Sequence, residues 1–162
     1  MRWLLVDTID EMVVEDRAYG RKTYGDSEEF FQDHFPGFPV VPGVLILESL
    51  AQLAGKLIGY TVRKKRGDWP FPILSMMQKV KFRKFVAPGQ EIKLEVRLRS
   101  LRDESASVTV YARVGRKLHA QAEQFFVFNA IPLADEEERA RVERIERSEL
   151  IRLWADCPKE DK

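Results

Sequence analysis

One long apolar segment constrains the fold of this 162-residue chain more than any other feature. It follows a stretch, residues 36–43, in which five of eight residues are proline or glycine, which indicates a stiff and ordered loop. Pro42 predicts a helix start, because proline lacks the N–H that the first helical position leaves unused. We therefore expect a helix from about residue 42 to about residue 60.

This helix should be buried nearly all round. From Val44 to Leu53 only Glu48, Ser49 and Gln52 interrupt the hydrophobic residues, whereas a surface helix shows a single apolar stripe. Glu48 and Gln52 are one turn apart on the same face, so the Gln52 amide can hydrogen-bond the carboxyl group and hold its rotamer. Glu48 therefore faces a water-filled gap, pairs with a base, or serves as an acid in catalysis.

The remaining residues up to about 128 predict a sheet. Residues 3–24 have the composition of a strand pair, and four later segments alternate apolar and polar residues with a period of two. The turn sequences Pro88-Gly89 and Val114-Gly115 predict hairpins between consecutive strands. A sheet can bury a helix that is apolar on all sides by curling around it, so we expect an α+β fold.

The residues after this expected domain, which we place at 1–130, have a different character. Residues 131–162 form a charged extension in which Asp135 and Glu138 resemble a capping box, and we expect one amphipathic helix or a helix broken at Ser148. Its apolar stripe should pack on the domain or on a partner chain, and consists of Val142, Ile145, Ile151 and Trp154. The tail has a net charge of −3 and residues 1–130 have +4.

Composition excludes several classes of protein. A net charge of +1 lacks the basic excess of a dedicated nucleic-acid binder. The longest uncharged apolar run, residues 38–47, is short of the ~20 residues that span a bilayer, so we expect no membrane segment. Cys157 is the only cysteine and can form neither an internal disulfide nor a thiolate metal site, which favours the cytoplasm.

Two further residues are candidates for chemistry. His34 lies at the mouth of the Pro-Gly loop, where a histidine is more often a surface or capping residue than a catalyst. Gly43 lies at the expected helix start, where free N–H groups can polarise a carbonyl oxygen, although Pro-Gly is also an ordinary helix entrance. His119 alternates with the apolar face of a strand, and we expect it to be exposed.

Residues 34–52, with the sequence HFPGFPVVPGVLILESLAQ, resemble the signature of the 3-hydroxyacyl-[acyl-carrier-protein] dehydratases of fatty-acid synthesis, which have the hot-dog fold. His34 and Glu48 are 14 residues apart, as in that family's catalytic pair. Residues 4–7, 80–89 and 115–123 are also similar to family segments, so the likeness covers roughly residues 4–128. Glutamate rather than aspartate at position 48 favours the dehydratase-only branch, and Met1-Arg2-Trp3 stands where the family has a His-Arg element.

The resemblance implies an antiparallel sheet wrapped around a long central helix, and a homodimer with shared active sites that can assemble further, for example into a trimer of dimers. It implies that His34 removes the α-proton and that Glu48, supported by Gln52, assists departure of the 3-hydroxyl group. Gly43 and Val44 would bind the thioester oxygen through the helix start. No metal or cofactor is implied beyond the phosphopantetheine of the carrier protein.

The resemblance also implies sites for the acyl chain and for the carrier. Phe35, Leu45 and Leu53 are the candidate walls of an acyl tunnel, and Trp69 or Phe71 is the candidate for an aromatic gate. Acyl carrier protein is acidic, so basic side chains of the body are the candidates for docking it; they are Arg63, Lys64, Lys65, Arg66, Lys81, Arg83 and Lys84.

Two other functions stay open from the sequence. A hot-dog acyl-thioesterase would use an acid and a helix start in a similar way, but would not require His34 in that loop. A noncatalytic protein that binds acyl thioesters or acyl carrier protein would account for the changed amino-terminal element and the added tail.

Overall fold

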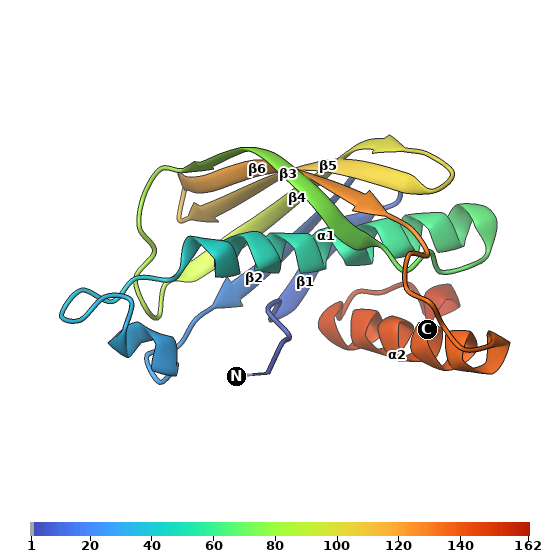
Figure 1. The fold of residues 1–162 in the computed structure, drawn as a ribbon, viewed down its shortest axis with the longest axis horizontal. Helices are drawn as coiled ribbons and strands as arrows, with labels where there is room; N and C mark the ends of the chain where they lie inside the picture. The colour runs from blue at the N-terminus through green and yellow to red at the C-terminus, as the bar shows by residue number, and fades with distance from the viewer. Residues whose placement is uncertain (1) are drawn as a thin grey trace.

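The computed structural model describes residues 2–162. In chain order its elements are β1 (Thr8–Val13), β2 (Arg17–Thr23), a 3-10 turn (Glu29–Gln32), α1 (Gly43–Arg66), β3 (Ile73–Phe82), β4 (Glu91–Leu101), β5 (Ser105–Val114), β6 (Lys117–Val127), α2 (Glu136–Leu153) and a last 3-10 turn (Lys159–Asp161). The strands form one six-stranded antiparallel sheet in the order β1-β2-β4-β5-β6-β3. The sheet curves around α1, and α2 lies beside the C-terminal half of α1 (Figure 1). The α+β class and the sheet wrapped around a helix are confirmed.

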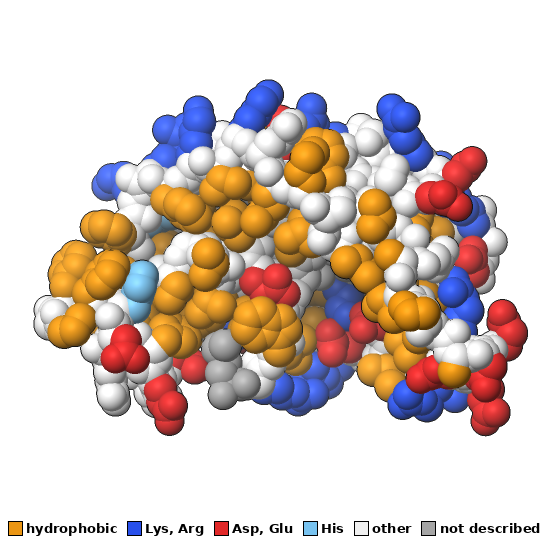
Figure 2. All heavy atoms as spheres, in the orientation of Figure 1, with side chains coloured by type: hydrophobic (Ala, Val, Ile, Leu, Met, Phe, Trp, Pro, Cys, Tyr) orange, Lys and Arg blue, Asp and Glu red, His pale blue; other side chains and the backbone are white. Residues whose placement is uncertain are grey.

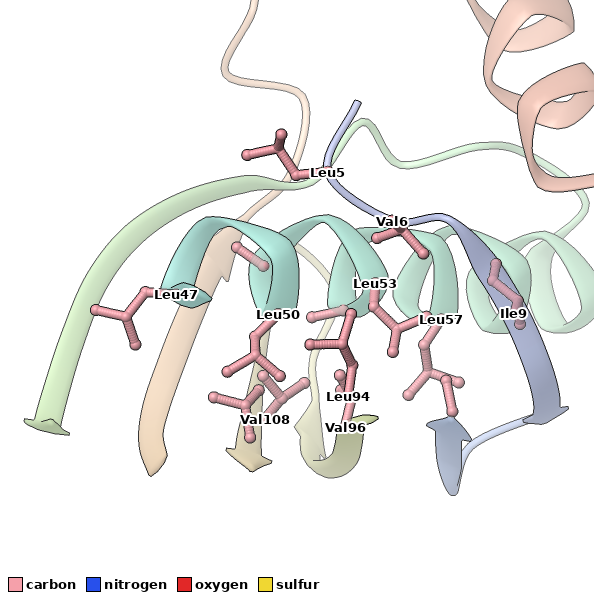
Figure 3. Packing of buried hydrophobic residues seen from close by; sticks show 14 of the residues in the cluster. Leu5, Val6, Ile9, Leu47, Leu50, Leu53, Leu57, Leu94, Val96 and Val108 are labelled. Carbon is pink, nitrogen blue, oxygen red and sulfur yellow. The ribbon is translucent and has the colours of Figure 1, made fainter. Parts of the chain in front are cut away.

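The core lies between α1 and the concave face of the sheet. One face of α1 presents leucines at helical spacing toward alternating residues of β4 and β5 (Figure 3). Leu5, Val6 and Ile9 close the core from the amino-terminal segment. The residues labelled on the two sides of this interface are Leu47, Leu50, Leu53 and Leu57 of α1, and Leu94, Val96 and Val108 of the strands.

Helix α1 continues past the expected end at residue 60 as far as Arg66. Its last turn holds four basic residues, which interact favourably with the negative end of the helix dipole, and Gly67 ends it in the left-handed conformation with φ of 87°. By length and composition α1 could cross a membrane, but 67% of its most apolar window is buried inside the fold. Its hydrophobic character is therefore that of a core helix.

The strand order corrects one prediction about connections. Pro88-Gly89 does not form a hairpin, because β3 pairs with β6 at the far edge of the sheet and not with β4. The chain between β3 and β4 instead passes the start of α1, where the Val41 N–H donates to the carbonyl of Val86. The hairpin at Val114-Gly115 is confirmed between β5 and β6.

His119 is a second correction, because it is buried rather than exposed. The segment that follows β3 covers its side of β6: the His119 ring lies with Nδ1 3.1 Å from the carbonyl oxygen of Phe85. Arg83 donates its N–H to the His119 carbonyl. Alternation within β6 alone does not reveal this cover, because it comes from a different part of the chain.

The tail forms one continuous helix through Ser148 and packs on the domain. Asp135 accepts from the N–H of Glu138, and the Glu138 carboxylate accepts from the N–H of Ala134, so the predicted cap is present in a shifted form. Ile145, expected in the apolar stripe, is exposed. The other three stripe residues do pack on the core: Trp154 is buried, and Val142 and Ile151 are partly buried. The tail residues Leu150, Leu153 and Cys157, not predicted in the stripe, are also buried in the main core.

Candidate active site

His34 is held by the turn that follows the first 3-10 helix. The loop closes on itself, because the Val40 N–H donates to the His34 carbonyl and Phe35 and Phe38 exchange two backbone hydrogen bonds. The imidazole is half-buried and stacks on the Phe35 ring at 4.2 Å between centroids. The Pro-Gly sequence therefore gives His34 a fixed place beside the start of α1.

The hydrogen bond of the imidazole determines which nitrogen can act as a base. Nδ1 of His34 lies 3.0 Å from the carbonyl oxygen of Val40. A carbonyl only accepts, so in neutral imidazole the proton resides on Nδ1 and Nε2 keeps its lone pair. His34 thus presents the nitrogen that a proton-abstracting base requires.

Glu48 is half-buried on α1 and is held by two donors. Gln52 donates its amide N–H to Glu48 Oε1 at 3.1 Å, as the one-turn spacing predicts, and the Trp3 indole N–H donates to the same oxygen at 3.1 Å. The orientation of Gln52 is fixed in turn, because its amide oxygen accepts from the Leu5 N–H at 2.7 Å. One carboxyl oxygen is therefore anchored and the other is available for chemistry.

Trp3 is a contact that sequence reasoning missed. The indole N–H of this residue supplies a hydrogen bond to Glu48. The sequence feature that pointed to such a contact is an aromatic side chain with an N–H donor directly before the Leu4–Asp7 segment. Its partner, 45 residues away, was not deducible from spacing.

The start of α1 has no side-chain cap over the backbone N–H groups of its first turn. Pro42 is the N-cap and provides no side-chain hydrogen bond to the first turn. A Cβ at Gly43 would lie 2.5 Å from the exposed Phe82 ring of β3, so a larger residue there would require that ring to move. Val44 is 70% exposed, so this end of the helix opens onto the surface.

Ser49 of α1 contacts a buried tyrosine on the opposite side of the helix. The Tyr24 hydroxyl donates to the Leu45 carbonyl at 3.0 Å and lies 2.6 Å from Ser49 Oγ. Burial raises the pKa of Tyr24 to about 12, so it stays neutral over the physiological range. This hydrogen bond fixes the first turns of α1, which carry the site.

A cavity of about 410 Å³ lies along α1 beside Glu48. Gln52 and Trp3 line it near the carboxyl group, and Trp69 and Phe71 form part of its wall. His34 does not line this cavity, so one chain does not bring the two predicted catalytic residues into one pocket.

The three residues predicted as walls of an acyl tunnel do not line a common cavity. Leu45 and Leu53 are buried in the core and line no part of this cavity, because their positions on α1 face the sheet. Phe35 is half-exposed next to His34. The two gate candidates are buried rather than at the surface, with Trp69 packed over Gly59 and Arg139 of α2 placed 4.8 Å above the Phe71 ring.

A continuous set of hydrophobic side chains is exposed on the face that carries the start of α1 and β3. Figure 2 shows hydrophobic side chains over much of this face, with an acidic group among them near the centre and many of the other charged groups toward the rim. Strand β3 is a sheet edge and has exposed residues along most of its length. The large exposed residues include Phe35, Phe38, Val44, Met76, Met77, Val80, Phe82 and Phe85.

The basic residues predicted for docking divide into two groups. The cluster at the end of α1 is engaged within the chain: Arg63 pairs with Glu143, Lys64 with Asp161 and Lys65 with Glu15, while Arg66 binds backbone carbonyls of the β4–β5 turn. In the second group, Arg83 is hydrogen-bonded to Gln121, and Lys81 and Lys84 are exposed. A further basic hollow of about 380 Å³, not foreseen, is lined mainly by Arg2, Arg141, Arg144 and Arg152.

Residues 2–162 contain no group of three or more histidine, cysteine, aspartate or glutamate side chains placed to hold a metal ion. Cys157 is buried under the tail, and burial raises the pKa of its thiol. Neither feature adds a group to the site at Glu48.

Comparison with solved structures identifies the fold. The chain is similar to the dehydratase heterocomplex ApeI:P from Xenorhabdus doucetiae, with a TM-score of 0.65, 15% identity and coverage of 86% of this chain and 89% of the other. It is also similar to an HP0420 homologue from Helicobacter felis, with a TM-score of 0.60, 13% identity and coverage of 82% and 85%. With its antiparallel sheet around one long helix, the chain is a hot-dog-fold protein.

Sequence comparison then gives the family. Residues 1–135 match the FabA-like domain. The 3-hydroxyacyl-[acyl-carrier-protein] dehydratase FabZ of Lactobacillus helveticus is 42% identical over 124 residues, which cover 76% of this chain and 82% of that protein. The FabZ of Caldanaerobacter subterraneus is 40% identical over 125 residues, 77% and 86% of the two chains. The chain therefore belongs to the FabA-like family, and the resemblance noted from residues 34–52 is confirmed.

Proposed function

We propose that this protein dehydrates 3-hydroxyacyl thioesters carried on acyl carrier protein to trans-2-enoyl thioesters. The observation that carries the proposal is that hydrogen bonds hold both His34 and Glu48 in the orientations that the reaction requires. The Val40 carbonyl orients His34 with a free Nε2, and Trp3 and Gln52 hold one oxygen of Glu48. The identity to proteins named as FabZ dehydratases supports the same activity.

The reaction requires a base, an acid and an oxyanion donor. His34 Nε2 takes the proton from C2 of the thioester, and the negative charge that develops on the thioester oxygen is stabilised by the Gly43 N–H at the start of α1. The electrons of the C2–H bond form the C2=C3 double bond as the C3–O bond breaks. Glu48 gives a proton to the departing hydroxyl group, directly or through a water, so that water leaves. Transfer of the proton from His34 back to Glu48 restores both groups.

The complete site forms between two copies of the chain. Within one chain His34 lies outside the cavity that contains Glu48, and the exposed hydrophobic face includes residues beside both the His34 loop and the α1 start. An apolar surface of this kind, next to an unpaired sheet edge, is typical of an interface. We place a second copy there, so that His34 of one chain reaches Glu48 of the other.

The carrier protein docks on exposed basic residues. The charges of Arg63, Lys64 and Lys65 are already neutralised by acidic side chains of the same protein. Lys81 and Lys84 are therefore the better candidates of those seven residues, because they lie exposed at the end of β3, beside the start of α1. Charge reversal at both lysines should raise KM for carrier-bound substrate and leave turnover of a small thioester analogue unchanged. The same reversal at Arg144 and Arg152 tests the basic hollow on α2.

The proposed reaction uses no metal or redox cofactor, since acid–base groups of the protein account for each step. The phosphopantetheine arm belongs to the carrier and delivers the substrate. A single buried thiol at Cys157 fits a reducing compartment, and we place the protein in the cytoplasm.

An assay with 3-hydroxybutyryl thioester tests the proposal. The purified protein should form the enoyl product, followed by its absorbance, without release of free thiol. His34→Ala and Glu48→Gln should each lower kcat by about 10²–10⁴-fold, the usual contribution of a positioned acid or base. Equal turnover in wild type and His34→Ala would overturn the mechanism. Thiol release without enoyl formation would indicate a thioesterase, and binding without either product would indicate a noncatalytic protein.

A mixture of the two inactive variants tests the shared site. A heterodimer of a His34→Ala chain and a Glu48→Gln chain has one site with both defects and one site with neither. Co-expression should therefore restore activity that the separate variants lack. Absence of any recovery in heterodimers whose assembly is verified would show that each chain works alone.

A further inference from the structure

The cavity beside Glu48 extends away from the carboxyl group to the tail helix. At one part it is lined by Glu48 and Gln52, and at another by Val142, Glu146 and Glu149 of α2. Residues 1–135 match the family, so α2 lies outside the matched region. We propose that this cavity binds the acyl chain of the substrate and that α2 and Lys56 close it, so that the protein prefers short and medium chains. This inference rests on the proposed function.

The glycine at position 55 leaves space in the cavity that a larger side chain would fill. A glycine in a helix interior costs roughly 0.5–1 kcal/mol relative to alanine. Gly43 and Gly59 of the same helix have a packing reason, because a Cβ there would lie 2.5 Å from Phe82 and 2.2 Å from Trp69. Gly55 has no such packing reason, because a Cβ there would meet no atom within 4 Å. Instead, Gly55 lines the cavity. The missing side chain keeps space free beside Gln52, along the path from Glu48 to α2.

Lys56 provides the end of the apolar path. Its side chain is 8% exposed and its Nζ lies 2.8 Å from both Glu146 Oε2 and Glu149 Oε1. A methylene chain that extended through this cluster would separate buried charges from their partners, which is strongly unfavourable. The ionic cluster therefore acts as a stop for an apolar chain.

The helix geometry sets the approximate length. Glu48 and Lys56 are eight residues apart, or about 12 Å along the helix axis. An extended hydrocarbon advances roughly 1.25 Å per carbon, given C–C bonds of about 1.5 Å at tetrahedral angles. About ten carbons therefore fit between the reacting centre and the stop.

The tail helix is fixed firmly enough to form a wall. Leu150 and Leu153 are buried in the main core, and Trp154 packs edge-on against Tyr60 of α1 with ring centroids 5.4 Å apart. Val142 is the apolar residue that α2 contributes to the cavity, whereas Ile145, three residues later, is exposed and lines the basic hollow instead of this cavity. This pair offers a test variant and a matched control.

The test measures kcat/KM for 3-hydroxybutyryl and 3-hydroxydecanoyl thioesters on the carrier protein. Gly55→Leu and Val142→Phe should each lower the decanoyl value at least tenfold and change the butyryl value less than twofold. The control Ile145→Phe should leave the ratio of the two values unchanged. Retained butyryl activity shows that each variant is folded.

Other outcomes would overturn the inference. An unchanged ratio in both Gly55→Leu and Val142→Phe, with wild-type dehydration intact, would show that the chain binds elsewhere while the proposed function stands. Loss of the dimer by gel filtration in Gly55→Leu would show that a second copy fills the space. Wild-type protein that dehydrates neither substrate would remove the proposed function itself, and this inference with it.

Discussion

Helix α1 is buried by two regions of different chemistry. The sheet covers it mainly with apolar side chains, as at Leu53, which is fully buried against β2 and β4, and Gln124 of β6 donates to the Leu47 carbonyl. The tail covers its other side with buried residues such as Leu150 and Trp154 and adds ion pairs, in which Lys56 is bound to two glutamates and Lys64 to Asp161. The same helix thus joins a mainly hydrophobic interface on the sheet side to an interface on the tail side that adds directional ion pairs.

The difference indicates separate roles for the two regions. Hydrophobic burial supplies most of the stability of a domain, whereas ion pairs contribute little unless they are buried, and then mainly fix one arrangement. We infer that the sheet side determines whether the chain folds and the tail side determines the shape of the cavity beside Glu48. The following substitutions test this division, beginning with the largest expected effect.

Leu53→Ala should lower the free energy of unfolding by about 3 kcal/mol, within the range for removing a buried leucine side chain. The loss should be the same at low and high salt, because no charge is involved. Urea denaturation at two NaCl concentrations measures both. A loss below about 1 kcal/mol would contradict the dominance of the sheet side.

Lys56→Met should lower the free energy of unfolding by about 2 kcal/mol, because it leaves Glu146 and Glu149 close together without their cation. This value lies below that of a fully buried pair, since both glutamates are partly exposed to solvent. As a control, the triple variant that combines Lys56→Met with Glu146→Gln and Glu149→Gln should recover at least half of the lost free energy of unfolding. No recovery would show that Lys56 acts through packing of its methylene groups.

Gly59→Ala should lower the free energy of unfolding by about 1–2 kcal/mol, since the new methyl group overlaps the buried Trp69 ring. Gly55→Ala, one turn earlier, should instead raise it by about 0.5–1 kcal/mol through helix propensity. Thermal unfolding of the two variants measures the contrast. Equal shifts for both would show that Trp69 adjusts freely.

Asp161→Asn should have the smallest effect, about 0.5–1 kcal/mol at pH 7, as expected of an ion pair near the surface. Although burial would raise the pKa of Asp161, hydrogen bonds from Lys64 and Tyr60 lower it below its usual value. The carboxylate thus stabilises the fold above its unfolded pKa of about 4, and this contribution is lost as the pH falls through the lower folded pKa. The difference between wild type and variant should therefore shrink between pH 5 and pH 3, and a constant difference would contradict the ionic role.

Most of the fold follows from residues whose pattern is local. The all-round apolar segment after Pro42 gave the central helix, and the period-two segments gave β4, β5 and β6. The pairing of β3 with β6 was not deducible, because alternation shows which face is buried but not which strand lies alongside. His119 was misplaced for the same reason, since its cover is donated by a segment more than 30 residues away.

In the candidate site too, contacts between residues close in sequence could be predicted, whereas contacts between distant residues could not. The helical spacing of Glu48 and Gln52 predicted their hydrogen bond, which the structure contains. The Trp3 contact and the Lys56 cluster joined residues 45 and 90 positions apart. Lys56 did leave a signal, because a lysine inside an apolar helix is rarely buried without an acidic partner.

By itself the sequence determined the local chemistry of this protein: a stiff loop that presents His34, a buried helix that carries Glu48, and a capped, charged tail helix. Helix propensity, proline geometry and hydrophobic period act over a few residues, so these features can be predicted from the residues alone. Tertiary structure alone decided that α2 lies along α1 and that a cavity separates the two helices beside Glu48. Such an arrangement depends on which distant side chains neutralise and cover one another, and no local pattern specifies that choice.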